Sequence, residues 1–515
     1  MNDRSAVNGG AQDPDAFVIG SGPNGLVAAC HLARAGWKVH VLETADAAGG
    51  AVRSAEITEP GFIHDLGAAF FPFGKLSPAL KPLDLEGAGL RWLHAPLESA
   101  HIATDGSCAS IARDVELAAR CMGGGDDGET WSKMARWHGD TVDELLALLL
   151  STLPPSPSAA IKLGWPGLTM LADAALSSGR AWSERHFRSS TARRVIPGLA
   201  LHTDIGPSDP CGGAVGFMLA MLASSGGFAV PEGGTSAITG ALLSRLAEHG
   251  GSLETGARVT KIITRQGRAV ALRTADGREL TATRAIIADV SAPSLYLDLL
   301  AEEDVPPRIR RHMRAFRQGF GTFKMDWALD ALPAWIAEDA QRASVVHTGD
   351  DNDDLDRFVR QVRAGELPSD PYLVIGQQSL SDPTRAPTGK HTLWAYSRVP
   401  SKIEGGWEQA KQRYADRIEK RIESMAPGFR SQIRARHITS PADLEKMNAN
   451  LRGGDLGGGS AQMRHQLLFR PVFPYFRYRT PVQGLYLGSS YTHPGAGVHG
   501  ACGYNAAMMA LRDLA

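Results

Sequence analysis

Cysteine is scarce in the sequence, and the few cysteines present lie far apart. The 515 residues include five, none of them in a Cys-x-x-Cys or comparable close pair: Cys30, Cys108, Cys121, Cys211 and Cys502. This spacing argues against a disulfide framework, a zinc finger or other metal site, and a dithiol redox pair. Unpaired cysteines suit a reducing compartment, so the composition favours a cytoplasmic protein.

The sequence also lacks an excess of either charge. Lysine and arginine number 54 against 55 aspartates and glutamates, for a formal net charge of -1. This balance gives no overall electrostatic basis for binding nucleic acid, and we expect no nucleic-acid partner. With 43% hydrophobic and 21% charged residues, the chain has a globular composition. At about 150 residues per domain, its length predicts two large domains or three smaller ones.

Long apolar runs are missing as well. Residues 1–13 are polar and lack the apolar core of a signal peptide, so we expect a flexible lead-in. The longest uncharged stretch, residues 211–231, is interrupted by glycine and serine and is only marginally apolar for a membrane span. We therefore favour a buried helix beside an apolar ligand over a membrane span for this stretch.

The N-terminal region has the pattern of a strand, a helix and a second strand. The apolar run at residues 16–20 predicts a buried strand, residues 26–35 a helix that ends at Gly36, and residues 37–43 another strand. This βαβ unit is typical of a parallel sheet. Between its first strand and its helix lies Gly20-Ser21-Gly22-Pro23-Asn24-Gly25, which matches G-x-G-x-x-G.

Each part of this motif has a physical role in dinucleotide binding. Gly20 permits a tight turn, Gly22 lets a pyrophosphate approach the backbone, and Gly25 lets helix and strand pack closely. Pro23-Asn24 open the helix, whose free amides and dipole attract phosphate. Glu43 ends the second strand, where it can hydrogen-bond ribose hydroxyls and would repel a 2′-phosphate. The sequence thus predicts a dinucleotide site.

NAD and FAD both bind to this motif, and a glycine pair further along the chain indicates which of the two is bound. Gly49-Gly50, followed by Arg53-Ser54, resembles a segment of the large flavoprotein family that includes amine oxidases and phytoene desaturases. Two glycines let the chain pass close to an extended cofactor. Arg53 can neutralise a phosphate, hold a backbone turn, or form a surface salt bridge. The resemblance implies FAD, with these four residues among its contacts.

The C-terminal segment strengthens the resemblance. A strand at residues 484–489 enters a turn at Gly488-Ser489, and the run Thr492–Ala501, THPGAGVHGA, leads into a helix predicted over residues 498–511. This run is similar to the terminal signature of bacterial carotenoid desaturases. The resemblance implies that the helix N-terminus lies beside the flavin ring and ribityl chain, with cofactor contacts at Gly497, Val498 and Gly500. The positive end of the helix dipole there would stabilise negative charge on reduced flavin.

The middle of the chain resembles the same family. Pro231–Gly234 and Gly256–Val259 match its middle FAD segment, which implies that the backbone of Val259 holds the adenine. Residues 322–329 resemble a substrate-domain strand of the family. Residues 382–387, 389–391, 394–396 and 454–459 resemble a subgroup often called pyridine nucleotide-disulfide oxidoreductase domain-containing protein 2. That description does not suit this sequence, which has neither a redox cysteine pair nor a second G-x-G-x-x-G.

The resemblance implies an α/β fold: a Rossmann-like FAD-binding domain with a discontinuous α+β substrate domain, as in amine oxidases and phytoene desaturases. Residues 14–95, 226–305 and 470–515 would build the FAD domain. Residues 96–225 and 306–469 would build the substrate domain. The flavin ring would lie at the domain interface, where ligand pockets commonly form.

Two histidines are candidate catalysts. His493 and His499 fall where the family places the flavin face, so either can act as a general base, as a hydrogen-bond donor to the flavin, or only as a fixed part of the loop. Hydride transfer to flavin N5 can also proceed without a catalytic side chain. His64-Asp65, in a segment that resembles a flavin-proximal region, is expected to be structural.

We therefore expect FAD-dependent dehydrogenation, or desaturation, of an apolar small molecule, with hydride transfer to N5. Oxygen or a quinone would reoxidise the flavin, because no NAD(P)H domain is evident. Two alternatives stay open: a saturase or isomerase of a polyene, and a non-catalytic, FAD-stabilised interaction protein. The arginine-rich segment 308–317 is either a solvated helix between domains or a basic helix resting on an anionic membrane. The oligomeric state is left open.

Overall fold

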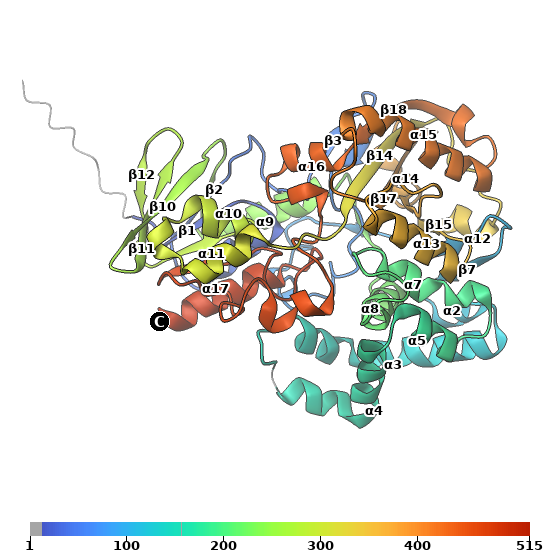
Figure 1. Cartoon of the computed structure of the whole chain (residues 1–515), viewed down its shortest axis with the longest axis horizontal. Helices are drawn as coiled ribbons and strands as arrows, with labels where there is room; N and C mark the ends of the chain where they lie inside the picture. The colour runs from blue at the N-terminus through green and yellow to red at the C-terminus, as the bar shows by residue number, and fades with distance from the viewer. Residues whose placement is uncertain (1–12, 156, 515) are drawn as a thin grey trace, which may run out of the picture.

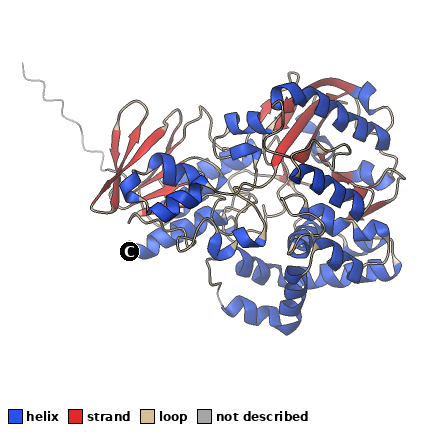
Figure 2. Cartoon of the chain, viewed as in Figure 1, coloured by secondary structure: helices blue, strands red, loops and turns tan. Residues whose placement is uncertain are grey.

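Two large sheets, each assembled from distant parts of the chain, organise the molecule (Figures 1 and 2). The computed structural model describes residues 13–155 and 157–514. The predicted lead-in, residues 1–13, therefore lies outside the described residues except for Asp13. One sheet lies near the C-terminus at the left of Figure 1, and the other lies at the upper right above a group of helices.

The first sheet is wholly parallel and has the strand order β19-β13-β1-β2-β9. Its strands are β1 (Ala16–Ile19), β2 (Val39–Leu42), β9 (Ser252–Glu254), β13 (Ala285–Ala288) and β19 (Leu485–Leu487). One face is covered by α1 (Pro23–Arg34), α9 (Ser236–Glu248) and α17 (Ala501–Asp513). Because both faces are covered, β1 and β13 are continuous apolar runs, AFVI and AIIA, rather than alternating ones.

A small antiparallel sheet and short helices cover the other face. They comprise β10 (Val259–Arg265), β11 (Arg268–Thr274), β12 (Glu279–Thr281), α10 (Ala292–Ser294) and α11 (Pro307–Arg314). β10 and β11 form a hairpin around Gln266-Gly267.

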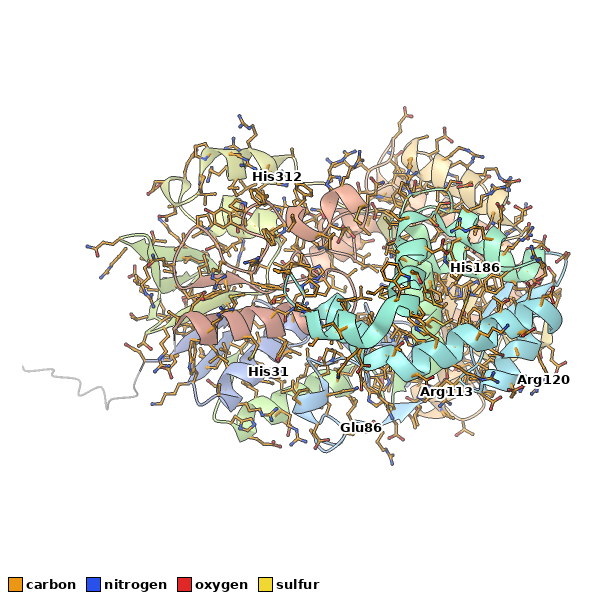
Figure 3. All side chains as sticks on the ribbon, turned by 90° about the horizontal axis from the view of Figure 1, so that it is seen from below. His31, Glu86, Arg113, Arg120, His186 and His312 are labelled. Atoms are coloured by element: carbon orange, nitrogen blue, oxygen red, sulfur yellow. The ribbon has the colours of Figure 1, made fainter. Side chains whose placement is uncertain are left out.

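The helix α11 corrects one predicted boundary. Ile309 and Met313, four residues apart on one helix face, are buried in the same apolar cluster as Phe17 and Ile19 of β1. The helix therefore packs with the parallel sheet and not with the substrate region that we began at residue 306. Figure 3 shows His312 of α11 and His31 of α1 in one half of the molecule and His186 of α5 (Gly179–His186) in the other. Since its apolar stripe faces the protein core, α11 cannot insert that stripe into a membrane.

The second sheet has seven strands in the order β18-β14-β17-β16-β15-β6-β7, antiparallel except for the parallel pair β15–β6. Its strands are β6 (Leu97–Ile102), β7 (Cys108–Ile111), β14 (Gly321–Leu329), β15 (Ala343–Thr348), β16 (Val374–Gly376), β17 (His391–Val399) and β18 (Ile433–Thr439). The helices that flank it are α12 (Glu338–Arg342), α13 (Asn352–Arg363), α14 (Gln378–Ser381), α15 (Trp407–Met425) and α16 (Pro441–Met447).

Residues 115–225 are mostly helical. The group at the lower right of Figure 1 consists of α2 (Val115–Cys121), α3 (Gly125–Leu150), α4 (Pro157–Leu176), α5, α6 (Ser190–Arg193), α7 (Val195–Ala200) and α8 (Gly212–Ser225). The uncharged stretch 211–231 forms α8, which is largely buried, as expected. Among the described residues, no helix is both long and apolar enough to cross a membrane.

Two short antiparallel pairs lie outside the large sheets. β3 (Ser54–Glu56) and β4 (Ile63–Asp65) form a hairpin, whereas β5 (Trp92–Leu93) pairs with the distant strand β8 (Val230–Pro231). The β3–β4 hairpin also contacts the seven-stranded sheet, because His64 lies 3.5 Å from Asp326 of β14. It therefore links the two halves of the molecule.

Candidate active site

The glycine-rich turn joins β1 to α1 as predicted. Gly20 has a φ of +93°, and Gly22 caps the helix that begins at Pro23. A Cβ at Gly25 would lie 2.2 Å from the carbonyl oxygen of Gly20, and one at Gly22 would lie 2.6 Å from Oδ2 of Asp289. The turn can therefore form only with glycine at these positions.

Glu43, one residue beyond β2, reaches this turn. Its Oε2 accepts hydrogen bonds from the backbone N–H and the hydroxyl of Ser21, at 2.8 and 2.6 Å, and its Oε1 accepts one from the N–H of Ala45 at 2.9 Å. The half-buried carboxylate is thus fixed beside the turn. The segment that contains Val259 lies next to it, since the N–H of Ala257 donates to the carbonyl of Glu43 at 2.8 Å.

The second glycine pair lies against the first motif. A Cβ at Gly50 would come within 3.1 Å of Cα of Gly22, and Gly49 has a φ of +110°. Arg53 donates from Nε to the carbonyl of Gly50 at 3.1 Å. Of the roles considered for Arg53, this contact supports holding the backbone turn.

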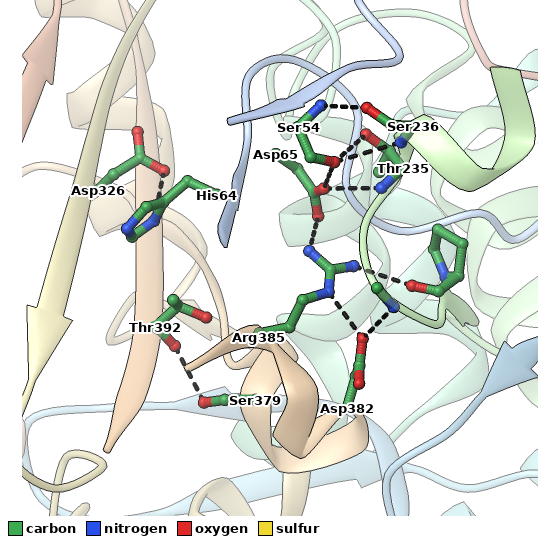
Figure 4. A network of polar contacts seen from close by, with 12 residues as sticks. Ser54, His64, Asp65, Thr235, Ser236, Asp326, Ser379, Asp382, Arg385 and Thr392 are labelled. Carbon is green, nitrogen blue, oxygen red and sulfur yellow. Dashed lines mark hydrogen bonds and ion pairs between the residues drawn. The ribbon is translucent and has the colours of Figure 1, made fainter. Parts of the chain in front are cut away.

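Ser54 is engaged away from the glycine-rich turn. Its hydroxyl donates to Oδ1 of Asp65 at 2.8 Å, and its N–H donates to Ser236 at 2.8 Å (Figure 4). Asp65 in turn pairs with Arg385, as Figure 4 shows. Ser54 does not line the cavity described below, so its contacts are those of the β3–β4 hairpin. The structural role expected for His64-Asp65 agrees with these contacts.

Asp289 follows β13 directly and was not predicted as a site residue. Its Oδ2 accepts a hydrogen bond from the N–H of Gly25 at 2.9 Å, and burial raises its pKa to about 7. Its backbone carbonyl accepts from the side chain of Asn450 at 3.0 Å. A signal was present in the sequence, because an acid directly after a buried parallel strand lies at the sheet edge where ligands bind.

The C-terminal loop comes to the same edge of the sheet. Gly488 donates its N–H to the carbonyl of Ala288 at 2.9 Å, and the buried Ser489 follows it. α17 begins at Ala501, not at residue 498 as predicted, because Gly497 and Gly500 adopt φ values of +116° and +69° that end regular structure before the helix.

His493 and His499 lie in this loop and line a common cavity. Nδ1 of His499 accepts a hydrogen bond from the N–H of Ala501 at 3.0 Å, so the neutral ring carries its proton on Nε2, which is buried without a partner. Nε2 of His493 is likewise buried without a partner. Burial lowers the pKa of each histidine to about 4, so both rings are neutral at pH 7. For His499, this tautomer favours the predicted donor role over the predicted base role.

The cavity has a volume of about 810 Å³. Gly22, Pro23, Asn24, Gly50, Gly497 and Val498 line one end of it with the two histidines. Most of its remaining wall is apolar and comes from α3, α4, α8 and β17, including Leu145, Leu149, Leu168, Leu171, Phe217, Met218, Met221 and Trp394. The expectation that α8 lies beside an apolar site agrees with this lining.

The predicted cofactor residues fall into two groups. Those on the cavity wall are Gly22, Pro23, Asn24, Gly50, Gly497 and Val498. Those that do not line it are Gly20, Gly25, Glu43, Gly49, Arg53, Ser54, Val259, Gly488, Ser489 and Gly500. Val259 is 8% exposed in the core beside β1.

The chemistry of this end of the cavity fits FAD. Among the described residues, three buried polar atoms lack hydrogen-bond partners there: Oδ1 of Asn24 and Nε2 of His493 and His499. They belong to residues that line the same cavity as Gly22, Gly50 and the N-terminus of α1. The turn and α1 would hold the phosphates, Glu43 the ribose, and the two histidines the ring end.

Comparison with known proteins agrees with this assignment. Residues 177–507, nearly two thirds of the chain, match the family model described as flavin containing amine oxidoreductase, and residues 18–83 match an NAD(P)-binding Rossmann-like domain. Pyridine nucleotide-disulfide oxidoreductase domain-containing protein 2 of Rattus norvegicus is 30% identical over 97% of this chain and 94% of its own length. The phytoene desaturase (neurosporene-forming) of Cereibacter sphaeroides is 26% identical over 96% and 93%. The solved structure of an oxidoreductase from Methanosarcina mazei shares the fold, with a TM-score of 0.63 at 16% identity over 96% of this chain and 99% of that one.

These findings confirm the predicted fold class, the family resemblance and the FAD cofactor. The glycine-rich turn after β1, its neighbour at residues 49–50 and the loop before α17 are the parts of this chain that carry the resemblance. The chain belongs to the flavin containing amine oxidoreductase family and is an FAD-dependent oxidoreductase.

Proposed function

We propose that this enzyme dehydrogenates an apolar, uncharged small molecule, and that oxygen or a quinone reoxidises the flavin. The observation that carries the proposal is the cavity, which continues from the cofactor end into a chamber walled by leucine, methionine and aromatic side chains. Burial of an apolar molecule against such a wall is favourable by roughly 25 cal/mol per Å².

The charged side chains on the cavity wall support an uncharged substrate. They are Asp204, Asp289, Arg398, Asp455 and Arg470. Each is hydrogen-bonded within the protein: Asp455, for example, accepts from the N–H groups of Gly319, Gly457 and Gly459 at 2.7 to 2.8 Å. A cationic amine or an anionic acid in the cavity would have to compete with these contacts for a counter-charge.

The chain's own residues have distinct tasks in this proposal. The N-terminus of α1 and the glycine-rich turn bind the pyrophosphate, and Glu43 orients the ribose. The Nε2–H of His499, which lies on the cavity wall, would donate a hydrogen bond to the ring end of the cofactor. The apolar wall excludes water from the reacting bond. FAD, when bound, supplies a two-electron acceptor.

The family comparison supports the same proposal, because the Cereibacter sphaeroides relative is named as a phytoene desaturase. A saturase or isomerase of a polyene would use the same cavity, and the mass of the product distinguishes it from a dehydrogenase. A non-catalytic FAD-stabilised protein would show a bound flavin that neither substrate nor reductant bleaches.

The test uses the flavin as its own reporter. Protein purified without added cofactor is expected to show a flavin spectrum, and heating is expected to release a molecule of FAD mass. Under anaerobic conditions, phytoene or another isoprenoid hydrocarbon should bleach the flavin, whereas benzylamine should not. Bleaching by the amine alone would refute the apolar-substrate proposal.

A pair of variants locates the substrate. Ala214 of α8 lines the cavity, so Ala214→Trp should abolish bleaching while FAD remains bound. Ser244→Trp on the exposed side of α9 is the matched control and should leave bleaching intact. Equal bleaching in both variants would place the substrate elsewhere.

A further inference from the structure

Three histidines form a chain that leads from the cavity into the seven-stranded sheet. His202, after α7, is half-buried and lines the cavity. Its Nε2 lies 2.8 Å from Nε2 of His347 on β15. Nδ1 of His347 lies 3.0 Å from the hydroxyl of Ser99 on β6, and that hydroxyl lies 3.2 Å from Nε2 of His101.

The sheet itself aligns this chain. β15 and β6 pair in parallel, with His347 directly opposite His101, so the two rings lie on one face and stack at 4.4 Å. Ser99 precedes His101 by two residues and therefore faces the same side. No local pattern in the sequence marks these residues, because strand pairing brings them together.

The surroundings keep the three rings neutral. Arg398 donates to the carbonyl of His202, and Arg194 donates to the carbonyl of His101. Burial, together with Arg398, lowers the pKa of His202 to about 3. Burial, together with Arg194, holds the pKa of His101 well below the usual range, and burial next to His101 and His202 does the same for the pKa of His347. Tyr372, Tyr396 and Phe228 are neighbouring aromatic residues, and within the described part of the chain no carboxylate hydrogen-bonds any of the three rings.

A chain of neutral imidazoles can move a proton without keeping a charge. Each ring has one donor and one acceptor nitrogen, so the contact between His202 and His347 requires one ring to donate to the other. When Nε2 of His202 donates to Nε2 of His347, Nδ1 of His202 is an acceptor. Nδ1 of His347 then donates to the hydroxyl of Ser99, and that hydroxyl donates to Nε2 of His101. A concerted shift accepts a proton at Nδ1 of His202 and releases one from Nδ1 of His101. No buried imidazolium has to persist.

We propose that His202 is a general base for a substrate in the cavity, and that His347, Ser99 and His101 carry the proton away from the cavity to Nδ1 of His101, which lies beside Gly198 of α7. This proposal rests on the dehydrogenase function proposed above. Two C–H bonds of the substrate break and a C=C bond forms. One hydrogen leaves with its electron pair, which reduces the FAD by two electrons, and the other leaves as a proton to Nδ1 of His202.

The first test needs no knowledge of the substrate. 2-Naphthol is a small aromatic photoacid that emits in one band as the neutral phenol and in a longer-wavelength band after it has given up its excited-state proton. In the FAD-loaded protein we expect the longer-wavelength band, because the bound probe meets a proton acceptor. His202→Phe should lose that band at unchanged probe affinity by equilibrium dialysis, and His347→Phe should weaken it, since the proton can no longer pass on.

His138→Phe is the matched control. His138 is also buried in α3, with neither ring nitrogen hydrogen-bonded, but it does not line the cavity. This variant should keep the longer-wavelength band. If His202→Phe keeps the band as His138→Phe does, His202 is not the acceptor and the proposal is overturned.

A second measurement covers the case in which 2-naphthol does not bind, which would count against the apolar-substrate proposal and not against the histidine chain. Nitrogen-15 spectra of histidine-labelled, FAD-loaded protein report the tautomer of each ring. We expect His347→Phe to change the tautomer signal of His202 and to leave that of His138 unchanged. Independent tautomers for His202, His347 and His101 would refute the chain.

Discussion

Arg385 offers the sharpest test of how the two halves of the molecule are held together. The residue lies in the 3₁₀ helix η4 (Pro383–Arg385), and its side chain is 0% exposed, as are those of its partners Asp65 and Asp382. Its guanidinium donates to Asp382 at 2.8 Å, to Asp65 at 2.9 Å and to the carbonyl of Pro231 at 3.0 Å (Figure 4). One side chain, from the segment that precedes β17 of the seven-stranded sheet, therefore contacts both β4 and β8.

Arg385→Met removes these three hydrogen bonds and leaves two buried carboxylates. Breaking a buried ion pair by removing one partner costs about 3–5 kcal/mol. Asp65 keeps donors from Ser54 and Thr235, and Asp382 keeps donors from Gly233 and Thr384. We therefore expect the free energy of unfolding to fall by an amount near the lower limit, about 3 kcal/mol. This is a large share of the free energy of unfolding of a typical protein, about 5–15 kcal/mol.

The loss should depend on pH. Burial works to raise the pKa of Asp382, but hydrogen bonds from Thr384, Gly233 and Arg385 outweigh it and hold that pKa below the usual value. A carboxylate with a depressed pKa adds stability above its unfolded pKa, and this stability is lost as the pH falls through the folded pKa. The deficit of Arg385→Met should thus be larger at pH 7 than below about pH 4, where Asp382 takes up a proton.

Urea unfolding followed by tryptophan fluorescence measures this deficit, and Arg434→Met is its control. Arg434 also bridges the two halves, from Glu59 to Asp330, but it does so at the surface, where solvent screens the ion pairs, and should contribute much less to stability than Arg385. Adding Asp382→Asn to Arg385→Met should restore part of the loss. A deficit no larger than that of Arg434→Met, or one that is equal at both pH values, would refute the reasoning.

Three further changes test the cofactor end. Glu43→Ala should lower the ratio of flavin to protein after purification at unchanged circular dichroism, because the turn and the ribose lose their acceptor; full retention would contradict its role. Gly25→Ala should lower both flavin content and Tm, since its Cβ would lie 2.2 Å from the oxygen of Gly20, whereas Gly240→Ala, with open space around it, should lower neither. Asp289→Asn should flatten the pH dependence of the unfolding free energy. The pKa of Asp289 is raised from 3.8 to about 7, so the free energy of unfolding of the wild type should fall by up to about 4 kcal/mol as the pH rises from 4 to 7. An equal dependence of the unfolding free energy on pH in both proteins would count against this.

The sequence by itself determined the features that depend on near neighbours. The strand at Ala16–Ile19, the glycine turn, the helix that follows and the buried α8 come from patterns within a few tens of residues, and the structure places all of them as predicted. The FAD cofactor and the family followed from the same short motifs. Local glycine geometry and apolar periodicity are written directly in the chain, because they act over single turns.

Only the tertiary structure decided the contacts between distant parts of the chain. Gly25 meets Asp289 across 264 residues, Asp65 meets Arg385 across 320, and His202 meets His347 across 145. The sequence likewise assigned Ser54 to the cofactor, whereas the hairpin turns its hydroxyl toward Asp65. Such contacts depend on strand order and register in two discontinuous sheets, and a long-range pairing leaves no periodic trace in the residues that take part in it.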